Sequence, residues 1–135
     1  MMRATIARLH APVYALLRFI SGMMFACHGA QKVLGWLGGH VQPAFSFMWF
    51  GGLIELVCGV LIAIGLVTRA AALVASGEMM VAYFKEHFAF AFANLHWLPI
   101  VNKGELAVVY CFLFLFFFVH GPGRYSLDQR FAIDH

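Results

Sequence analysis

The sequence predicts an all-α membrane protein, built as a four-transmembrane-helix bundle with antiparallel, up-down topology. Composition is the first observation behind this fold, since 63% of the 135 residues are hydrophobic and 11% are charged, whereas soluble domains are roughly half apolar and a quarter charged. Length is the second, because four mostly apolar stretches each supply the roughly 20 residues with which a helix crosses a bilayer core. The expected spans lie near Val13–Leu34, Phe45–Leu66, Ala70–Ala93 and Asn102–Gly121. They occupy almost the whole chain, so we expect residues 1–135 to form a single domain.

The first expected span follows Ala11-Pro12 and ends at the glycine-rich stretch from Gly35 to Gly39. Proline is tolerated in the first turn of a helix and therefore suits its start. Arg3 and Arg8 before the apolar run resemble the beginning of a signal peptide, but Arg18 interrupts that run and no cleavage motif of small residues follows. We expect this segment to be retained as a membrane span.

A tight turn from Gly65 to Arg69 separates the second and third expected spans and makes them antiparallel neighbours. The third span is interrupted by Lys85-Glu86-His87, and residues 88–92 alternate in a strand-like way. We expect it to be helical, because an unpaired strand in lipid would leave its backbone groups unsatisfied. After an interfacial loop, the apolar run Leu106–Val119 reaches spanning length only with its flanking residues.

Basic residues in the short loops predict the orientation. Arginines gather on one side of the expected topology, at positions 3, 8, 69, 124 and 130, and Lys32, Lys85 and Lys103 lie near the other. The positive-inside rule then places both termini in the cytoplasm of a bacterial inner membrane. The formal charge of +3 comes from scattered residues, which fits an anionic lipid surface, and no basic run supports nucleic-acid binding.

Ionisable residues inside the expected spans are the main functional signal, because such a residue is costly in hydrocarbon unless it is paired or faces a protein-lined cavity. These residues are Arg18, His28, Lys32, Glu55, Glu78, Lys85 and Glu105. At about 100° per residue, Arg18, His28 and Lys32 share one face of the first helix. Glu55 is flanked at four-residue spacing by glycines, which let a neighbouring helix approach it closely.

Two interpretations divide this polar set. Arg18 and Glu78 lie at similar depth, which favours a structural ion pair that fixes helix registry. The remaining excess of titratable groups around one cavity favours a binding or proton-handling site. Its members are Glu55, His28, Lys32 and Glu105, and the roles of His87 and His96 stay open. Cys27, Cys58 and Cys111 fall in different spans without the spacing of a dithiol or zinc site, so we interpret them as small core residues and expect no metal.

The order and spacing of several short motifs resemble the DoxX family of small four-helix membrane proteins along nearly the whole chain. The motifs are Arg18…His28-Gly29-x-x-Lys32, Gly51-Gly52-x-x-Glu55-x-x-x-Gly59, Gly65-x-x-Thr68-Arg69, Asn102-Lys103-Gly104-Glu105 and Gly121-Pro122-Gly123-x-x-Ser126-Leu127-Asp128. The resemblance implies a bacterial inner-membrane protein with four helices. It also implies links to respiratory or thiol redox systems, since the family takes its name from a subunit associated with quinone reduction.

The leading functional hypothesis is a membrane protein that binds a quinone or another small lipophilic or phenolic molecule and supports membrane redox chemistry. Glu55 and His28 are the candidate proton-exchanging, catalytic residues, and the candidate substrate-binding residues are Arg18, Lys32, Asn102 and Glu105. The sequence has no haem-attachment motif and no dinucleotide-binding glycine fingerprint. An oxidoreductase role would therefore need an external electron donor and a redox-protein partner.

Two alternatives from other classes stay open. The first is a non-catalytic scaffold or assembly factor for a redox complex, whose polar core only fixes the helices. The second is a proton-coupled small-molecule transporter. Whether the chain forms a homo-oligomer is also open.

Overall fold

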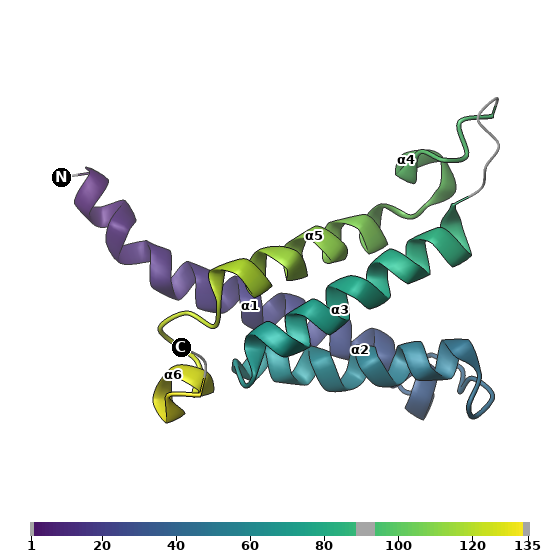
Figure 1. Cartoon of the computed structure of the whole chain (residues 1–135), viewed down its shortest axis with the longest axis horizontal. Coiled ribbons are helices and arrows are strands. Elements are labelled where there is room, and N and C mark those ends of the chain that lie inside the picture. Colours follow the sequence, from purple (N-terminus) through teal and green to yellow (C-terminus); the bar gives the residue numbers. More distant parts are fainter. Residues whose placement is uncertain (1, 89–93, 134–135) are drawn as a thin grey trace.

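A computed structural model describes residues 2–88 and 94–133 of the chain. Its elements are α1 (Met2–Leu34), α2 (Phe47–Ile64), α3 (Thr68–Ala82), the π-helix η1 (Tyr83–His87), α4 (Pro99–Asn102), α5 (Glu105–His120) and α6 (Leu127–Phe131). No strand occurs in these residues. The all-α prediction is therefore confirmed, and Figure 1 shows α2, α3 and α5 lying along the long axis of the molecule.

Glycines bring α1 and α2 into close antiparallel contact. A Cβ atom added at Gly22 would lie 2.6 Å from the backbone nitrogen of Ala63, and one added at Gly29 would collide with the backbones of Gly52 and Leu56. As the chain advances along α1, its neighbours thus run backwards along α2. Small residues at such an interface let two helices in lipid gain van der Waals contact that larger side chains would prevent.

Local signals fix the ends of α2. The side chain of Ser46 accepts a hydrogen bond from the backbone nitrogen of Trp49 at 3.2 Å, which is the usual way to satisfy a free N–H at a helix start. Gly65 ends the helix in the left-handed conformation with φ of 71°, which glycine adopts without steric cost. The chain turns there into α3.

The core lies between α1, α2, α3 and α5, and its aromatic side chains come from α1 and α5. Phe25 of α1 is fully buried, with its ring centroid 4.7 Å from that of Phe114 and 5.3 Å from that of Tyr110 on α5. The hydroxyl of Ser76 on α3 donates to the carbonyl of Cys111 at 2.8 Å, which ties α3 to α5. Ring packing rather than backbone approach thus joins α1 to α5.

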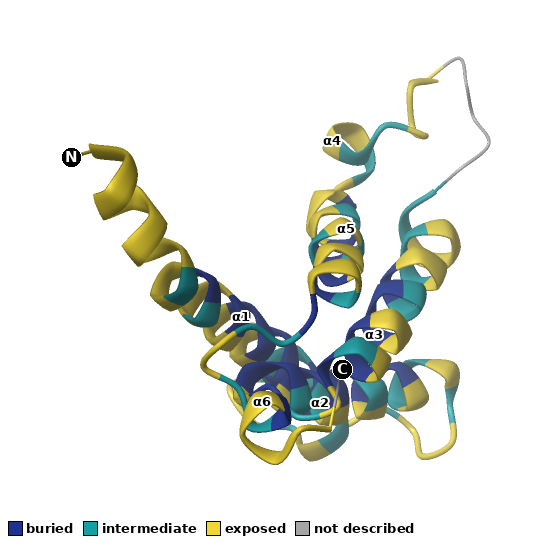
Figure 2. Cartoon of the chain, turned by 60° about the vertical axis from the view of Figure 1, so that its left-hand side comes forward, coloured by how far each residue is buried: buried dark blue, intermediate teal, exposed yellow. Residues whose placement is uncertain are grey.

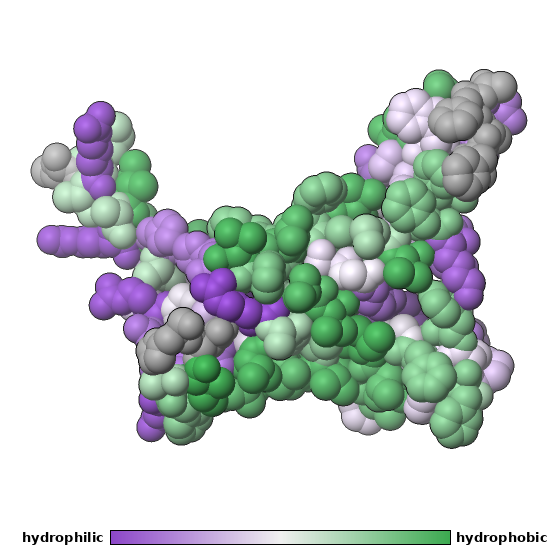
Figure 3. All heavy atoms as spheres, in the orientation of Figure 1, coloured by the Kyte–Doolittle hydropathy of each residue, from purple (hydrophilic) through white to green (hydrophobic). Residues whose placement is uncertain are grey.

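The outer surface is apolar. Large side chains such as Val57, Leu73 and Val109 are about half exposed or more, and Figure 3 shows hydrophobic residues covering most of the middle of the molecule. Met2–Leu34 and Phe47–Ile64 are long and apolar enough to cross a membrane, and Glu105–His120 is a shorter apolar helix. A lipid environment removes the cost that water would impose on such a surface.

The elements differ from the expected spans in three places. Pro12 lies inside α1, which begins at Met2 and has 33 residues, so the helix measures about 50 Å and outruns a bilayer core of about 30 Å. Figure 2 shows that this N-terminal part of α1 is exposed.

The third expected span is α-helical only to Ala82 and continues as η1, and residues 89–93 of that prediction lie outside the described residues. In the fourth, Lys103 has a φ of 62°, which breaks the helix and leaves α5 to begin at Glu105.

Candidate functional site

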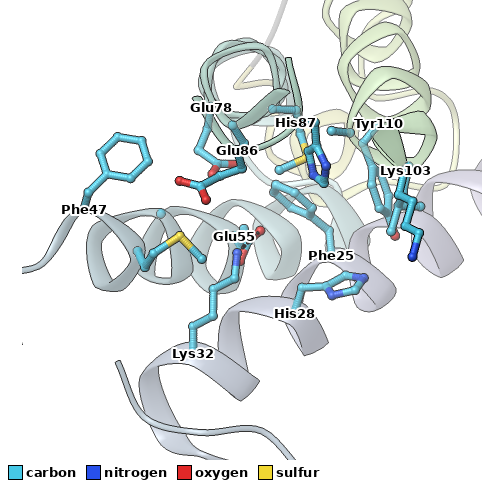
Figure 4. Close-up of a pocket in the computed structure, with 16 residues that line it drawn as sticks. Phe25, His28, Lys32, Phe47, Glu55, Glu78, Glu86, His87, Lys103 and Tyr110 are labelled. Carbon is cyan, nitrogen blue, oxygen red and sulfur yellow. Dashed lines mark hydrogen bonds and ion pairs between the residues drawn. The ribbon is translucent and has the colours of Figure 1, made fainter. Parts of the chain in front are cut away.

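A cavity of about 460 Å³ opens at the end of the molecule where α1 ends and α5 begins. Figure 4 shows its side chains converging from α1, α2, α3, η1 and α5. Pockets for small molecules commonly have volumes of roughly 300–1,000 Å³ and combine apolar walls with a few polar groups. This cavity fits that description, because three acids and four basic or histidine side chains stand among apolar ones. The charged and histidine side chains are Glu55, Glu78 and Glu86, with His28, Lys32, His87 and Lys103.

One ion pair is formed at the cavity. The ammonium nitrogen of Lys32 on α1 lies 2.8 Å from Oε1 of Glu55 on α2, and Figure 4 shows it reaching across between the two helices. The Glu55 side chain is 3% exposed and that of Lys32 is 26% exposed. A Cβ atom at Gly52 would lie 2.6 Å from Cβ of Lys32, so the glycine makes room for the lysine to lie along α2.

Three buried polar atoms around this cavity have no hydrogen-bond partner among the described residues. They are Oε2 of Glu55, Oε2 of Glu78 and the hydroxyl of Tyr110. Tyr110 as a whole is 4% exposed. Leaving a buried polar atom without a partner costs about 1–3 kcal/mol, so native structures rarely gather such atoms in one place without a reason.

Apolar and aromatic side chains form the rest of the wall. Phe25, Met79 and Leu106 line the cavity, and the ring of Tyr110 stacks on Phe114 with an interplanar angle of 17°. Phe47 also lines it, and the ammonium of Lys85 lies 3.3 Å from the centroid of the Phe47 ring. The site can therefore hold an apolar ring and bind polar groups at the same time.

The π-helix η1 supplies two further lining residues, Glu86 and His87. A π-turn adds a residue to the helical repeat and rotates the following side chains, and such turns are frequent at functional sites. Nδ1 of His87 lies 3.2 Å from the carbonyl oxygen of Asn102. This contact holds η1 against the residues that precede α5.

Sequence reasoning had selected some of the side chains that line the cavity and had missed others. His28, Lys32 and Glu55 come together as the face analysis of the first two helices predicts. Sequence reasoning missed Tyr110 and Lys103. Tyr110 shares one face of α5 with Leu106 and Ala107, but the helix is apolar throughout, so no periodic signal marks that face. Lys103 lies outside the helix, two residues before α5 begins.

The expected ion pair between Arg18 and Glu78 is not formed. Glu78 lies in the cavity beside Glu55, whereas Arg18 is about 15 Å along α1 from His28 at 1.5 Å per residue. The guanidinium of Arg18 donates to the carbonyl oxygens of Ile62, at 2.9 Å, and of Tyr125, at 2.6 Å. It also donates to the carbonyl of Pro122. Backbone carbonyls at the end of α2 and after α5 thus satisfy this buried cation. Arg18 was expected to contact a ligand, but in the structure it joins segments of the fold.

Asp128 is a second buried charged residue, at the end of the molecule where Arg18 lies. We call Arg18, Asp128 and their hydrogen-bond partners the polar hub. Its carboxylate is fully buried and accepts hydrogen bonds from the backbone nitrogens of Val67, at 2.6 Å, and Thr68, at 2.8 Å, and from the Thr68 hydroxyl, at 2.7 Å. No side chain near the start of α3 caps that helix. Asp128 therefore acts as its N-cap from a distant part of the chain, and the N-terminal end of the helix dipole favours this negative charge.

Asn102 and Glu105, both expected to contact a ligand, do not line the cavity. The amide nitrogen of Asn102 lies 3.2 Å from the Tyr83 hydroxyl and 2.9 Å from the carbonyl of His96, and its oxygen accepts from the backbone nitrogen of Gly104. Glu105 is exposed in the first turn of α5. Asn102 therefore shapes the loop that carries Lys103 toward the cavity.

No group of three or more metal-ligating side chains occurs in the part of the chain that the structure describes. Cys27, Cys58 and Cys111 are free thiols on three different helices.

Comparisons with known proteins identify one protein family and two bacterial relatives. The sequence pattern of the DoxX family matches residues 13–88. An uncharacterized protein of Haemophilus influenzae is 40% identical over 121 residues, which cover 87% of this chain and 89% of the relative. An uncharacterized membrane protein of Mycobacterium tuberculosis is 30% identical over 142 aligned positions, which cover 92% of this chain and 86% of the relative. No solved structure matches.

Proposed function

This chain belongs to the DoxX family, and from that premise we propose that it is a multi-pass protein of the bacterial inner membrane that binds a small lipophilic molecule. The ligand class we propose is a quinone or a related phenolic compound, and the site is the cavity beside Lys32, Glu55 and Tyr110. In this role the protein supports membrane redox chemistry. Membrane lipids surround the apolar outer face.

We propose four membrane crossings with both termini in the cytoplasm. Helices α1 and α2 have spanning length and composition. The third crossing uses the 15 residues of α3 with the five of η1, and the fourth uses the 16 residues of α5 with its flanks. The positive-inside rule then puts the cavity in the outer half of the bilayer, because it lies at the end that carries Lys32 and Lys103.

The observation that carries the proposal is the coincidence of one cavity with three unpartnered polar atoms. In a protein whose surroundings are lipid, water cannot reach such atoms freely, and a ligand that satisfies them offsets their cost. An aromatic ligand ring would lie against Phe25 and Leu106 while its oxygen substituents meet Glu55, Glu78 and Tyr110. Amphipathic ring compounds with oxygen at their edges combine these two properties.

The chain contributes binding and proton exchange to the proposed chemistry. His28 is half-buried in the cavity wall, with its ring centroid 6.4 Å from that of Tyr110. Glu55 also lines the cavity and forms an ion pair with Lys32. Histidine and carboxylate side chains are the groups that most often take up or release protons from ligand hydroxyls. Electrons would pass to or from a redox-protein partner.

Filling the cavity tests the proposal. Ala107 is 7% exposed and lines the cavity, whereas Ala70 is exposed in the first turn of α3. We expect the protein in lipid nanodiscs to bind duroquinone or its quinol saturably. Ala107→Phe should weaken that binding at least about tenfold because the added ring takes up ligand space, and Ala70→Phe should leave it unchanged. Absence of saturable binding of both compounds, or binding that Ala107→Phe does not weaken, would refute the proposal.

A scaffold role is the second candidate, and the polar hub around Arg18 and Asp128 favours it. There the protein itself satisfies the buried charges, as a purely structural device requires. Native mass spectrometry of gently extracted protein separates the two candidates. A co-purified lipid-soluble aromatic ligand supports the binding role, and a stable complex with another protein and an empty cavity supports the scaffold.

A further inference from the structure

The unpartnered atoms of the cavity differ in what they can offer a ligand. Two of the three are carboxylate oxygens, on Glu55 and Glu78. An ionised carboxylate only accepts hydrogen bonds, whereas a tyrosine hydroxyl both donates and accepts. With both carboxylates ionised, the unsatisfied capacity of the cavity is therefore mainly capacity to accept.

Two of the donor side chains that line the cavity already contact acceptors, and a third lies away from Glu78. The ammonium of Lys32 donates to Oε1 of Glu55, which leaves Oε2 of the same carboxylate without a partner. His87 is engaged with the carbonyl of Asn102. Lys103 is exposed, and Figure 4 shows it on the far side of the cavity from Glu78.

The two carboxylates also stand close to each other along α2. A Cβ atom added at Gly51, one helical turn before Glu55, would lie 3.1 Å from Oε1 of Glu78, so the absence of a side chain at Gly51 lets Glu78 cross to α2. Both carboxylates thus reach the same wall of the cavity from adjacent helices. A ligand in the cavity meets two acceptors on one side.

We infer that the cavity prefers the reduced, hydroxyl-bearing form of its ligand, a quinol or another dihydroxy-aromatic compound, over the oxidised quinone. This inference rests on the proposed function and names the redox form that the site selects. Hydroxyl groups of the ligand donate to the free oxygens of Glu55 and Glu78. A quinone has carbonyl oxygens that only accept, so it leaves both carboxylates unpartnered and sets its own lone pairs against theirs.

Three matched compounds test the inference. Durohydroquinone, duroquinone and the dimethyl ether of durohydroquinone share one ring and its methyl groups, and only the first carries donors. Binding is measured anaerobically by isothermal titration calorimetry on the full chain in lipid nanodiscs. We expect durohydroquinone to bind at least about tenfold more tightly than either other compound, since one hydrogen bond to a charged group is commonly worth that factor or more.

The outcomes separate this inference from the proposed function. Duroquinone or the ether binding as tightly as durohydroquinone overturns the preference and leaves ring binding intact. A lack of saturable binding by all three compounds overturns both.

A variant of Glu78 provides a second readout. Glu78→Gln keeps the volume of the side chain and adds an amide donor, and it leaves the pair of Lys32 and Glu55 in place. The ratio of quinol to quinone affinity should fall toward one in this variant. Glu105→Gln, at an exposed position that does not line the cavity, is the matched control and should keep the wild-type ratio. An unchanged ratio in folded Glu78→Gln would overturn the assignment of Glu78 as an acceptor for the ligand.

Discussion

Removing the carboxylate of Asp128 should unfasten the polar hub and destabilise the whole fold. Asp128→Ala deprives three donors of their shared acceptor, namely two backbone N–H groups at the start of α3 and the Thr68 hydroxyl. At a net value of about 1 kcal/mol for each hydrogen bond the loss is about 3 kcal/mol, and burial of the stranded donors raises it. We therefore expect the free energy of unfolding to fall by about 3–5 kcal/mol.

The assay is unfolding by sodium dodecyl sulfate, followed by circular dichroism, on detergent-solubilised protein. Asp128→Asn is an informative second variant, because its amide oxygen can replace one acceptor atom while its NH₂ group faces a donor. It should lose less stability than Asp128→Ala. Gln129→Ala, an exposed neighbour in the same short helix α6, is the matched control and should change stability by less than about 0.5 kcal/mol.

A loss below about 1 kcal/mol in Asp128→Ala would refute the reasoning, since it would mean that solvent or lipid headgroups replace the carboxylate at little cost. The same conclusion would follow if Asp128→Ala and Gln129→Ala were equally stable. Either result would mean that the C-terminal segment contributes little to the stability of the fold.

Three further predictions follow from other parts of the structure. Gly29→Ala should destabilise the protein by about 1–3 kcal/mol in the same unfolding assay, because the new methyl group collides with the backbone of α2. Gly77→Ala is the control and should not destabilise it, because a Cβ atom there meets nothing within 4 Å. Equal stabilities of the two variants would contradict the close packing of α1 on α2. Arg18→Leu should lower the free energy of unfolding, because Arg18 bonds to backbone carbonyls away from the cavity. The affinity of the folded variant for durohydroquinone should stay within about twofold of wild type. A tenfold loss of affinity would indicate that Arg18 contacts the ligand. Cytoplasmic reporters fused at either terminus or in the turn at Thr68 should be active, and a reporter near Gly38 should not; an active reporter near Gly38 would reverse the proposed orientation.

The candidate site was predictable from sequence only where its geometry follows from one helix. His28 and Lys32 share a face of α1 by helical periodicity, and Glu55 has glycines one turn away on either side, so their convergence followed from residue spacing. Tyr110 lies in a run so uniformly apolar that periodicity marked no face of α5. Its place in the cavity depends on how α5 packs against Phe25, which is a contact between distant parts of the chain.

The partners of Arg18 show a different limit. Depth in the membrane suggested Glu78, because sequence reasoning searches for an opposite charge on another side chain. The structure satisfies Arg18 with backbone carbonyls, which every residue carries and which therefore leave no mark in the sequence. Because Arg18 bonds to backbone carbonyls, it does not pair with Glu78, whose side chain lines the cavity.

The sequence by itself determined the helical, membrane-embedded class, because 63% hydrophobic residues in long apolar runs can be buried only in lipid and only with their backbone hydrogen bonds closed inside helices. The glycines at four-residue spacing around Glu55 also predicted that a neighbouring helix approaches α2 closely, and the structure shows that this helix is α1. Only the tertiary structure decided that Asp128 caps α3 and that Glu78 stands beside Glu55. Both are contacts between residues that are far apart in the sequence, and short-range periodicity carries no information about such contacts.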